Sequence, residues 1–312
     1  MPLIEQAVEL LQRAHAERSA GPEPEPVRKP TGQLIQHREG SSASDASAAV
    51  IAVPCRSDRA VRNFIPALRA GGLLAPEGED RKLAAEYRKI KQPLLSAMMA
   101  GDRPRLGNVV VVTSALPGDG KSFTAVNLAL SLALERDREV VLVDGDVAKP
   151  NVTHVLGMDG EPGLLDLVAA GCKLEEAIVK TDHPALYVLP SGKQSGEATE
   201  ILRSERMASM IKLLASEPKR IALIDSPPLL ATSEAGVLTS LAGQVVLVVR
   251  AAHTPQEAVL HAIEAISDDI PVSLVLNQVD AVSAHRYGYY GQYGYGTAVG
   301  GTVDVASGSD PN

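Results

Sequence analysis

Six short apolar runs rich in valine, isoleucine and leucine constrain the fold of this chain more than any other feature. They are apolar at consecutive positions, which is typical of strands covered on both faces. Helical patterns near residues 121–135, 198–215 and 255–266 lie between them. This alternation predicts an α/β fold, a doubly wound and mostly parallel sheet with helices on both faces. The predicted strands are Asn108–Ser114, Glu139–Asp144, Ala185–Leu189, Arg220–Asp225, Gln244–Arg250 and Pro271–Leu276.

The loop after the first strand has the composition of a phosphate-binding loop and leads directly into a helical pattern. Glycines let backbone N–H groups approach phosphate oxygens, and the start of a helix adds the positive end of its dipole. We therefore expect a P-loop NTPase in which Lys121 reaches the β- and γ-phosphates of ATP and Ser122 ligates Mg²⁺. The usual motif begins with glycine, where this chain has Ala115. The predicted nucleotide-binding residues of the loop are Pro117, Gly118, Asp119, Gly120, Lys121, Ser122 and Phe123.

Carboxylates follow two further strands. Asp144 and Asp146 come at the end of one apolar run, and Asp225 ends another before a Pro-Pro pair. Because parallel strands place their ligands at their carboxyl ends, these side chains are predicted to hold Mg²⁺ beside the loop and to act in catalysis with Lys121. Asn277, after the last strand, is a candidate contact for the adenine edge, although an asparagine that closes a strand through its side chain fits equally.

The ends of the chain differ from this middle part. Residues 1–18 have helical spacing, either as a helix on its own domain or as one that docks on a partner. Residues 21–48 are rich in Pro and Ser, and residues 49–78 match no clear pattern; the whole range 19–78 is predicted to be a largely disordered linker. The folded domain is predicted to span 79–282, beginning with a helix that ends before Pro93, and 283–312 to form a flexible tail rich in Tyr and Gly.

Composition excludes several classes of protein. The net charge of −8 disfavours a primary nucleic-acid binder. The two cysteines have no metal or disulfide spacing, which favours a reduced, cytosolic protein. No segment approaches the roughly 18 apolar residues of a membrane-spanning helix, so we expect any membrane association to occur through a partner.

The tail contains five of the seven tyrosines of the chain within nine residues. The interleaved Gly and Gln leave it without apolar residues for a core, so a flexible phosphoacceptor segment is the functional interpretation, and a low-complexity appendage is the alternative. The candidate acceptors are Tyr287, Tyr289, Tyr290, Tyr293 and Tyr295.

With this tail, the segments GDGKS, VDGD and IDSPP resemble those of the bacterial tyrosine kinases of capsule and exopolysaccharide synthesis, over roughly residues 80–295. Within that family the chain is similar to the stand-alone autokinases of exosortase-linked loci. The resemblance implies an ATP- and Mg²⁺-dependent autokinase that phosphorylates its own tail in trans and regulates polysaccharide polymerisation and export. It also implies that one of Asp144 and Asp146 helps to deprotonate the incoming tyrosine.

Two departures from the family pattern bear on this interpretation. The family motif D-x-D-x-R has Ala148 in place of its arginine, and we predict that Lys149 partly replaces the missing charge, without the bidentate fork of arginine. The helix with Arg88 and Lys91 resembles the subunit-contact motif E-x-x-R-x-x-R, but Ala85 replaces its glutamate and Lys91 replaces its second arginine.

The resemblance implies a homo-oligomeric ring and a membrane-embedded co-polymerase activator, with the kinase peripheral at the inner membrane. The main alternative is a nucleotide-switched ATPase of the plasmid-partition and division-site type without kinase activity. Those relatives often place a signature lysine in the loop, where this chain has Leu116. A weakly catalytic, ATP-binding regulator of an export partner is a third interpretation, which the Ala148 departure favours.

Overall fold

A seven-stranded sheet runs through the part of the chain that the computed structural model describes, namely residues 63–99, 106–169 and 173–279. Its strand order is β3-β4-β2-β5-β1-β6-β7, and all neighbours pair in parallel except β3 with β4. The predicted fold class is therefore confirmed, and each of the six predicted strands is found within one residue of its expected bounds. The strands are β1 (Val109–Ser114), β2 (Glu139–Asp144), β3 (Val179–Lys180), β4 (Leu186–Leu189), β5 (Arg220–Asp225), β6 (Gln244–Arg250) and β7 (Val272–Asn277).

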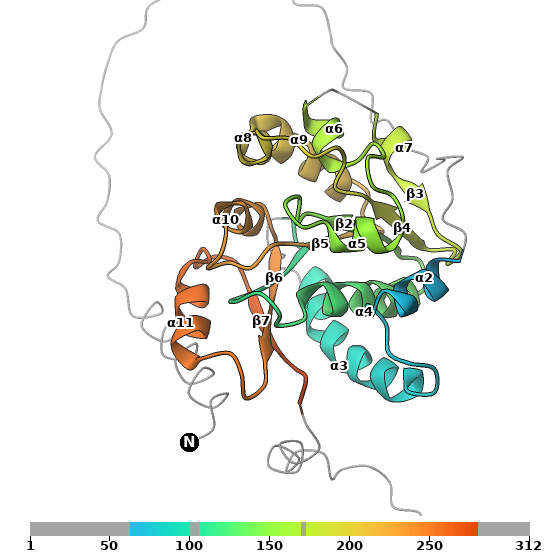
Figure 1. The fold of residues 1–312 in the computed structure, drawn as a ribbon, viewed down its shortest axis with the longest axis vertical. Helices are drawn as coiled ribbons and strands as arrows, with labels where there is room; N and C mark the ends of the chain where they lie inside the picture. The colour runs from blue at the N-terminus through green and yellow to red at the C-terminus, as the bar shows by residue number, and fades with distance from the viewer. Residues whose placement is uncertain (1–62, 100–105, 170–172, 280–312) are drawn as a thin grey trace, which may run out of the picture.

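Helices cover both faces of the sheet, and each face has its own apolar cluster (Figure 1). Successive residues of β1 alternate between the two clusters, because side chains of a strand point to opposite faces. Val110 and Val112 pack with the cluster under α3 (Asp80–Met99) and α4 (Lys121–Ala133). Val109 and Val111 pack with the cluster under α9 (Glu205–Ala215), α10 (Ser233–Ser240) and α11 (Gln256–Glu264). Both sets are fully buried, which explains why the strand is apolar at every position.

The helices are α2 (Phe64–Ala70), α3 (Asp80–Met99), α4 (Lys121–Ala133), α5 (Asn151–Val155), α6 (Leu164–Ala169), α7 (Leu174–Ala177), α8 (Ala198–Arg203), α9 (Glu205–Ala215), α10 (Ser233–Ser240) and α11 (Gln256–Glu264). The single helical stretch expected over 198–215 is two helices. Ser204 separates them because its backbone is extended and its hydroxyl accepts from the backbone N–H of Met207, which caps the start of α9.

The prediction that the first long helix ends before Pro93 is wrong. Pro93 lies inside α3, on an exposed position. Proline removes one helical hydrogen bond, but the exposed position lets water reach the carbonyl group that is left free. Leu94 and Met98 are 1% and 5% exposed beyond it, and burial of these side chains favours continuation of the helix.

Helix α2 lies within the range that the sequence assigned to a linker. Phe64 and Leu68 of this helix are fully buried, and the Leu73 carbonyl after it accepts a hydrogen bond from Asn127 of α4. Residues 64–75 therefore pack against the domain, which a disordered linker would not do. The predicted helix of residues 1–18 and the tail of residues 283–312 lie outside the described residues.

The register of the sheet brings three strand ends together. Asp144, the last residue of β2, is aligned with Asp225, the last residue of β5, and β1 lies on the other side of β5. Because these strands are parallel, their carboxyl ends and the loop after β1 share one edge of the sheet. The predicted phosphate loop and the predicted carboxylates are thus neighbours.

Candidate functional site

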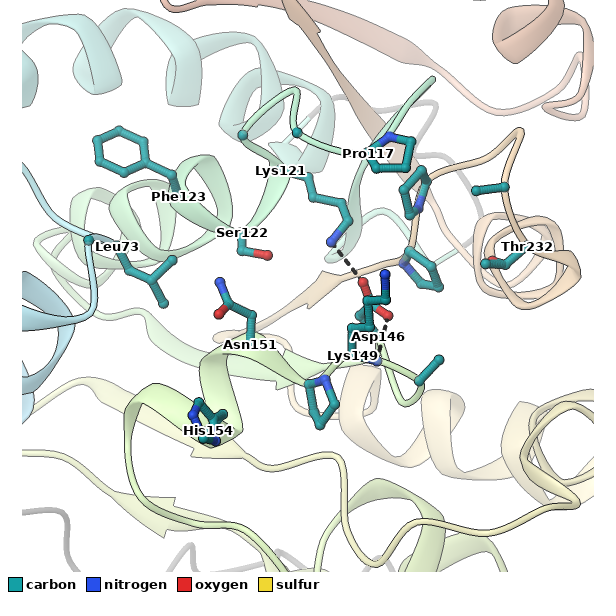
Figure 2. A pocket seen from close by; sticks show the side chains of 18 of the residues that line it. Leu73, Pro117, Lys121, Ser122, Phe123, Asp146, Lys149, Asn151, His154 and Thr232 are labelled. Carbon is teal, nitrogen blue, oxygen red and sulfur yellow. Dashed lines mark hydrogen bonds and ion pairs between the residues drawn. The ribbon is translucent and has the colours of Figure 1, made fainter.

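A cavity of about 910 Å³ opens at this edge of the sheet. Lys121 and Ser122 of α4 and Asp146 after β2 line it, and the chain segment around Pro227 closes it on another side. Figure 2 shows Lys121 and Asp146 pointing toward each other, with Leu73 and Phe123 on one side of them and Pro117 and Thr232 on the other. The volume is in the range of small-molecule and cofactor sites.

The loop between β1 and α4 has the backbone that a phosphate-binding loop requires. Gly118 and Gly120 have φ angles of 88° and 94°, in the left-handed region that favours glycine. A Cβ on Gly120 would lie 2.0 Å from Asn277 Nδ2, so glycine is also required by close packing there. The loop ends where α4 begins, at Lys121.

Asp119 shapes this loop from inside. Its side chain is fully buried; Oδ2 accepts from the Leu116 N–H at 3.2 Å, and Oδ1 accepts from the Thr254 hydroxyl at 2.7 Å. The sequence predicts Asp119 as a nucleotide contact, but its carboxylate is occupied by bonds within the protein. Thr254, after β6, was not predicted, because nothing near it in sequence indicates a contact 135 residues away.

Asn277 holds the loop from the other side. It is the last residue of β7, it lines the cavity, and its Nδ2 donates to the Asp119 carbonyl at 2.9 Å. This bond commits the side-chain amide to the loop backbone. Among the described contacts of this side chain, Oδ1 has no hydrogen bond. A contact between Asn277 and an adenine edge stays a prediction.

Lys121 is held by acidic side chains. Its Nζ donates to Asp146 Oδ2 at 2.8 Å, and both side chains are largely buried. Burial by itself lowers the pKa of Lys121, but the negative charges of Asp225 and Asp146 outweigh burial, so the pKa lies above its usual value. Lys121 is therefore a cation at neutral pH, positioned at the start of α4.

Asp144 and Asp225 are buried carboxyl groups with unused oxygens. Burial, and then the neighbouring charge of Asp225, raises the pKa of Asp144 to about 7. Burial raises the pKa of Asp225 to about 6, against the opposing effect of the Lys121 charge. Among the described residues, Asp144 Oδ1 and both oxygens of Asp225 have no hydrogen-bond partner. Buried polar atoms are normally paired, so these oxygens are placed to bind something that the polypeptide does not supply.

The remaining predicted site residues lie around this centre. Ser122 and Phe123 both line the cavity, Phe123 on the side of Leu73 and away from Pro117 (Figure 2). Ala148 and Lys149 also line it; the Lys149 side chain is exposed, and its backbone N–H donates to Asp146 Oδ1 at 3.2 Å. The five tail tyrosines lie outside the described residues.

The two residues predicted for a subunit contact differ in their exposure to solvent. Arg88 is exposed on α3, but Lys91 is 4% exposed. Lys91 Nζ donates to the Ser131 carbonyl at 2.8 Å and forms an ion pair with Glu135 at 2.6 Å. The structure places Lys91 inside the domain, because the helical spacing that puts it near Arg88 also turns it toward the end of α4. Its role in a subunit contact stays a prediction.

Comparisons with known proteins agree with this geometry. The AAA domain family (AAA_31) matches residues 107–275. The putative tyrosine-protein kinase EpsB of Ralstonia solanacearum is 32% identical over 229 residues, which cover 72% of this chain and 30% of EpsB. The tyrosine-protein kinase YwqD of Bacillus subtilis is 32% identical over 184 residues, which cover 58% of this chain and 77% of YwqD. The BceF tyrosine kinase domain superimposes with a TM-score of 0.55 at 26% identity, over 67% of this chain and 86% of that domain.

The relatives differ in how much of their length this chain matches. It spans about 30% of EpsB and most of YwqD. In the described parts of the chain, no helix combines the length and the apolar character that crossing a bilayer requires.

Proposed function

The chain belongs to the bacterial tyrosine-protein kinases, and from that premise we propose that it transfers the γ-phosphoryl group of ATP to tyrosines of its own tail. The acceptors are the five tyrosines of residues 287–295 in a neighbouring copy. One observation carries the proposal: the phosphate-binding loop, the charged Lys121 and Asp146 line one cavity, and Asp144 and Asp225 are buried beside it at the ends of neighbouring strands. Phosphoryl transfer depends on positioning and on offsetting negative charge, and these groups serve both.

The charges of the site fit a divalent cation. When all are ionised, Asp144, Asp146 and Asp225 carry three negative charges against the single positive charge of Lys121. Among the described residues no three His, Cys, Asp or Glu side chains are arranged to hold a metal by themselves. Mg²⁺ commonly takes one or two carboxylates and completes its shell with phosphate and water. Ser122, Asp144 and Asp225 would hold Mg²⁺, which when bound offsets charge on the phosphates of ATP.

Lys121 and the loop backbone would bind the phosphates. The start of α4 offers backbone N–H groups that have no partner within the helix, and the positive end of the helix dipole would favour an anion there. The Lys121 ammonium would exchange its bond to Asp146 for the β- and γ-phosphate oxygens. The loop from Gly118 to Ser122 would hold the phosphates of ATP, and Asp146 lines the same cavity.

Asp146 is the carboxylate best placed to accept the proton of the incoming tyrosine. Asp146 lines the cavity, whereas Asp144 and Asp225 are fully buried behind it. Release of Lys121 toward the phosphates would free Asp146 Oδ2 for a phenolic hydroxyl. Lys149, beside it at the cavity, would supply part of the charge missing at Ala148, with looser contacts than an arginine.

The assembly belongs to the same proposal. A tail that reaches a neighbouring site requires self-association, and a ring of copies at the inner membrane, activated by a membrane-embedded co-polymerase, would couple phosphorylation to polysaccharide export. Phosphorylation of several tail tyrosines adds roughly −1.5 to −2 charge each and would loosen such a ring by repulsion. The nucleotide-switched ATPase without kinase activity is the alternative. Ala148, in place of the family arginine, favours a third candidate, a weakly catalytic, ATP-binding regulator.

The test is phosphorylation mapping by mass spectrometry after incubation with Mg-ATP and a candidate activator tail. We expect phosphate on residues 287–295 in the wild type and none in Lys121→Ala. Lys212→Ala, which removes an exposed lysine from the last turn of α9, is the matched control and should behave as wild type. Hydrolysis of ATP without phosphotyrosine in any condition would replace the kinase with the nucleotide switch.

A further inference from the structure

A buried threonine forms hydrogen bonds with the Asp144 carboxylate. Thr153, in α5, is 1% exposed and approaches Asp144 with two donors. Its backbone N–H donates to Asp144 Oδ2 at 2.7 Å, and its hydroxyl contacts the same oxygen at 2.8 Å. The second oxygen, Oδ1, has no partner among the described residues. Thr153 therefore distinguishes the two oxygens of one carboxylate.

A third group determines the direction of the hydroxyl proton. The Ser191 backbone N–H lies 3.0 Å from Thr153 Oγ1. A backbone N–H can only donate, so Oγ1 accepts from Ser191, and its single proton is left for Asp144 Oδ2. The three buried groups form a directed chain from Ser191 through Thr153 to Asp144. The carboxylate receives two hydrogen bonds on Oδ2 and none on Oδ1 among the described residues.

Further hydrogen bonds hold the backbone at Ser191, where this series of hydrogen bonds begins. The carbonyl groups of Pro190 and Ser191 accept from the N–H groups of Leu164 and Leu165 at 2.8 and 3.0 Å. Asp166 Oδ2 accepts from the N–H groups of Gly163 and Lys193, each at 3.0 Å, and so joins the two segments again. Thr153 thus accepts a hydrogen bond from a backbone segment that is itself hydrogen-bonded at several points to residues 163–166.

We propose that Thr153 is a positioning residue for phosphoryl transfer, which fixes the orientation of Asp144 so that its Oδ1 is presented to the metal and phosphate side of the site. The inference rests on the proposed function for the nature of the reaction. A group behind a metal-binding carboxylate typically changes metal affinity or activity by 10–100-fold when it is removed. Sequence alone does not indicate this role, because Thr153 lies nine residues beyond Asp144 and Ser191 another 38 residues on.

The experiment compares wild type, Thr153→Val and Thr153→Ser. Valine keeps the shape and removes the hydroxyl, whereas serine keeps the hydroxyl. Two quantities are measured: the rate of phosphotyrosine formation at saturating Mg-ATP, and the affinity for Mn²⁺ by electron paramagnetic resonance with a non-hydrolysable ATP analogue. We expect Thr153→Val to lower the rate by ~10–100-fold and the Mn²⁺ affinity by ~10-fold, with Thr153→Ser recovering both to within ~3-fold of wild type.

Thr239→Val is the matched control. Thr239 is also 1% exposed, but its hydroxyl bonds only to carbonyl groups of its own helix, α10. It should leave both the rate and the Mn²⁺ affinity at wild-type values, which separates the proposed role from the general cost of removing a buried hydroxyl group. The unfolding curve of Thr153→Val shows whether this variant folds. If it does not fold, Thr153→Ala takes its place in the comparison with Thr153→Ser.

The two readouts separate this inference from the proposed function. Wild-type rate and Mn²⁺ affinity in a folded Thr153→Val or Thr153→Ala protein would overturn the role of Thr153. Absence of phosphotyrosine in the wild type would instead contradict the kinase proposal. The loss of Mn²⁺ affinity in Thr153→Val, recovered in Thr153→Ser, would still support the positioning of Asp144.

Discussion

Replacement of Asp144 by asparagine should stabilise the nucleotide-free domain while it abolishes phosphoryl transfer. The carboxylate is fully buried, and one of its oxygens has no partner among the described residues. Asparagine has nearly the same shape, and its amide oxygen can accept both hydrogen bonds from Thr153. The substitution therefore removes a buried negative charge without breaking those contacts. The buried charge lowers the stability of the domain when no metal or nucleotide is bound. The same charge is needed for phosphoryl transfer when they are bound.

The magnitude follows from the pKa. A rise in the pKa of Asp144 from 3.8 to about 7 corresponds to ~4 kcal/mol of stability lost on ionisation. The asparagine NH₂ group then occupies the position of the unpaired oxygen, which costs ~1–3 kcal/mol if it finds no acceptor. The expected gain above pH 7 is therefore ~1–3 kcal/mol, or a rise in Tm of ~2–10 °C for a domain of this size.

The expected gain in stability depends on pH. Because the folded pKa of Asp144 is above its unfolded value, the stability that protonation contributes is fully present below about pH 4 and is lost as the pH rises to about 7. The difference between Asp144→Asn and wild type should grow over that window and then level off. At pH 5 most of the gain should be absent, because the wild-type carboxyl group is protonated in the folded protein.

The assay is urea unfolding at pH 5 and pH 8, in EDTA and without nucleotide, with Asp182→Asn, an exposed aspartate beside β3, as the control. A gain for Asp144→Asn at pH 8 that shrinks at pH 5 supports the account. Equal or lower stability at pH 8, or a gain of the same size at both pH values, would refute the reasoning that burial of this charge destabilises the empty site.

Three further predictions concern the packing around the loop and at the end of α4. Gly120→Ala should abolish binding of a fluorescent ATP analogue, because Gly120 has a φ of 94° and a Cβ there would meet Asn277. Thr254→Val should lower the free energy of unfolding by ~1–3 kcal/mol, measured in urea, and weaken ATP binding, since Asp119 loses its bond from a hydroxyl. Lys91→Ala should destabilise the domain by ~1–3 kcal/mol in the same assay, because the Ser131 carbonyl loses its buried donor; an unchanged urea midpoint would show that this lysine is dispensable for packing.

Much of the site could be predicted because it depends on short segments and on one rule of parallel sheets. Each buried strand is apolar along its length, and the loop and the aspartates directly follow strands. Parallel pairing then brings Asp144, Asp225 and Lys121 to one edge without knowledge of the strand order. The phosphate loop itself is local, since its glycines and its helix start lie within a few residues.

The parts that could not be predicted depend on contacts distant in sequence. Thr254 bonds to Asp119 across 135 residues, and Ser191 bonds to Thr153 across 38. Lys91 has the spacing of a surface residue, and only the position of α4 shows that it is buried. The continuation of α3 past Pro93 has the same origin, because packing of Leu94 and Met98 outweighs a local preference.

The central claim, transfer of phosphate from ATP to the tail of another copy, is tested most directly by mixing two defective variants. One is Lys121→Ala, which keeps its tyrosines; the other keeps Lys121 but has all five tail tyrosines replaced by phenylalanine. Both are incubated together with Mg-ATP and a candidate activator tail, and phosphorylated peptides are mapped by mass spectrometry. The account predicts phosphate on residues 287–295 of the Lys121→Ala protein in the mixture and on neither protein alone. No phosphotyrosine in the mixture, with the wild type phosphorylated under the same conditions, would contradict transfer between copies.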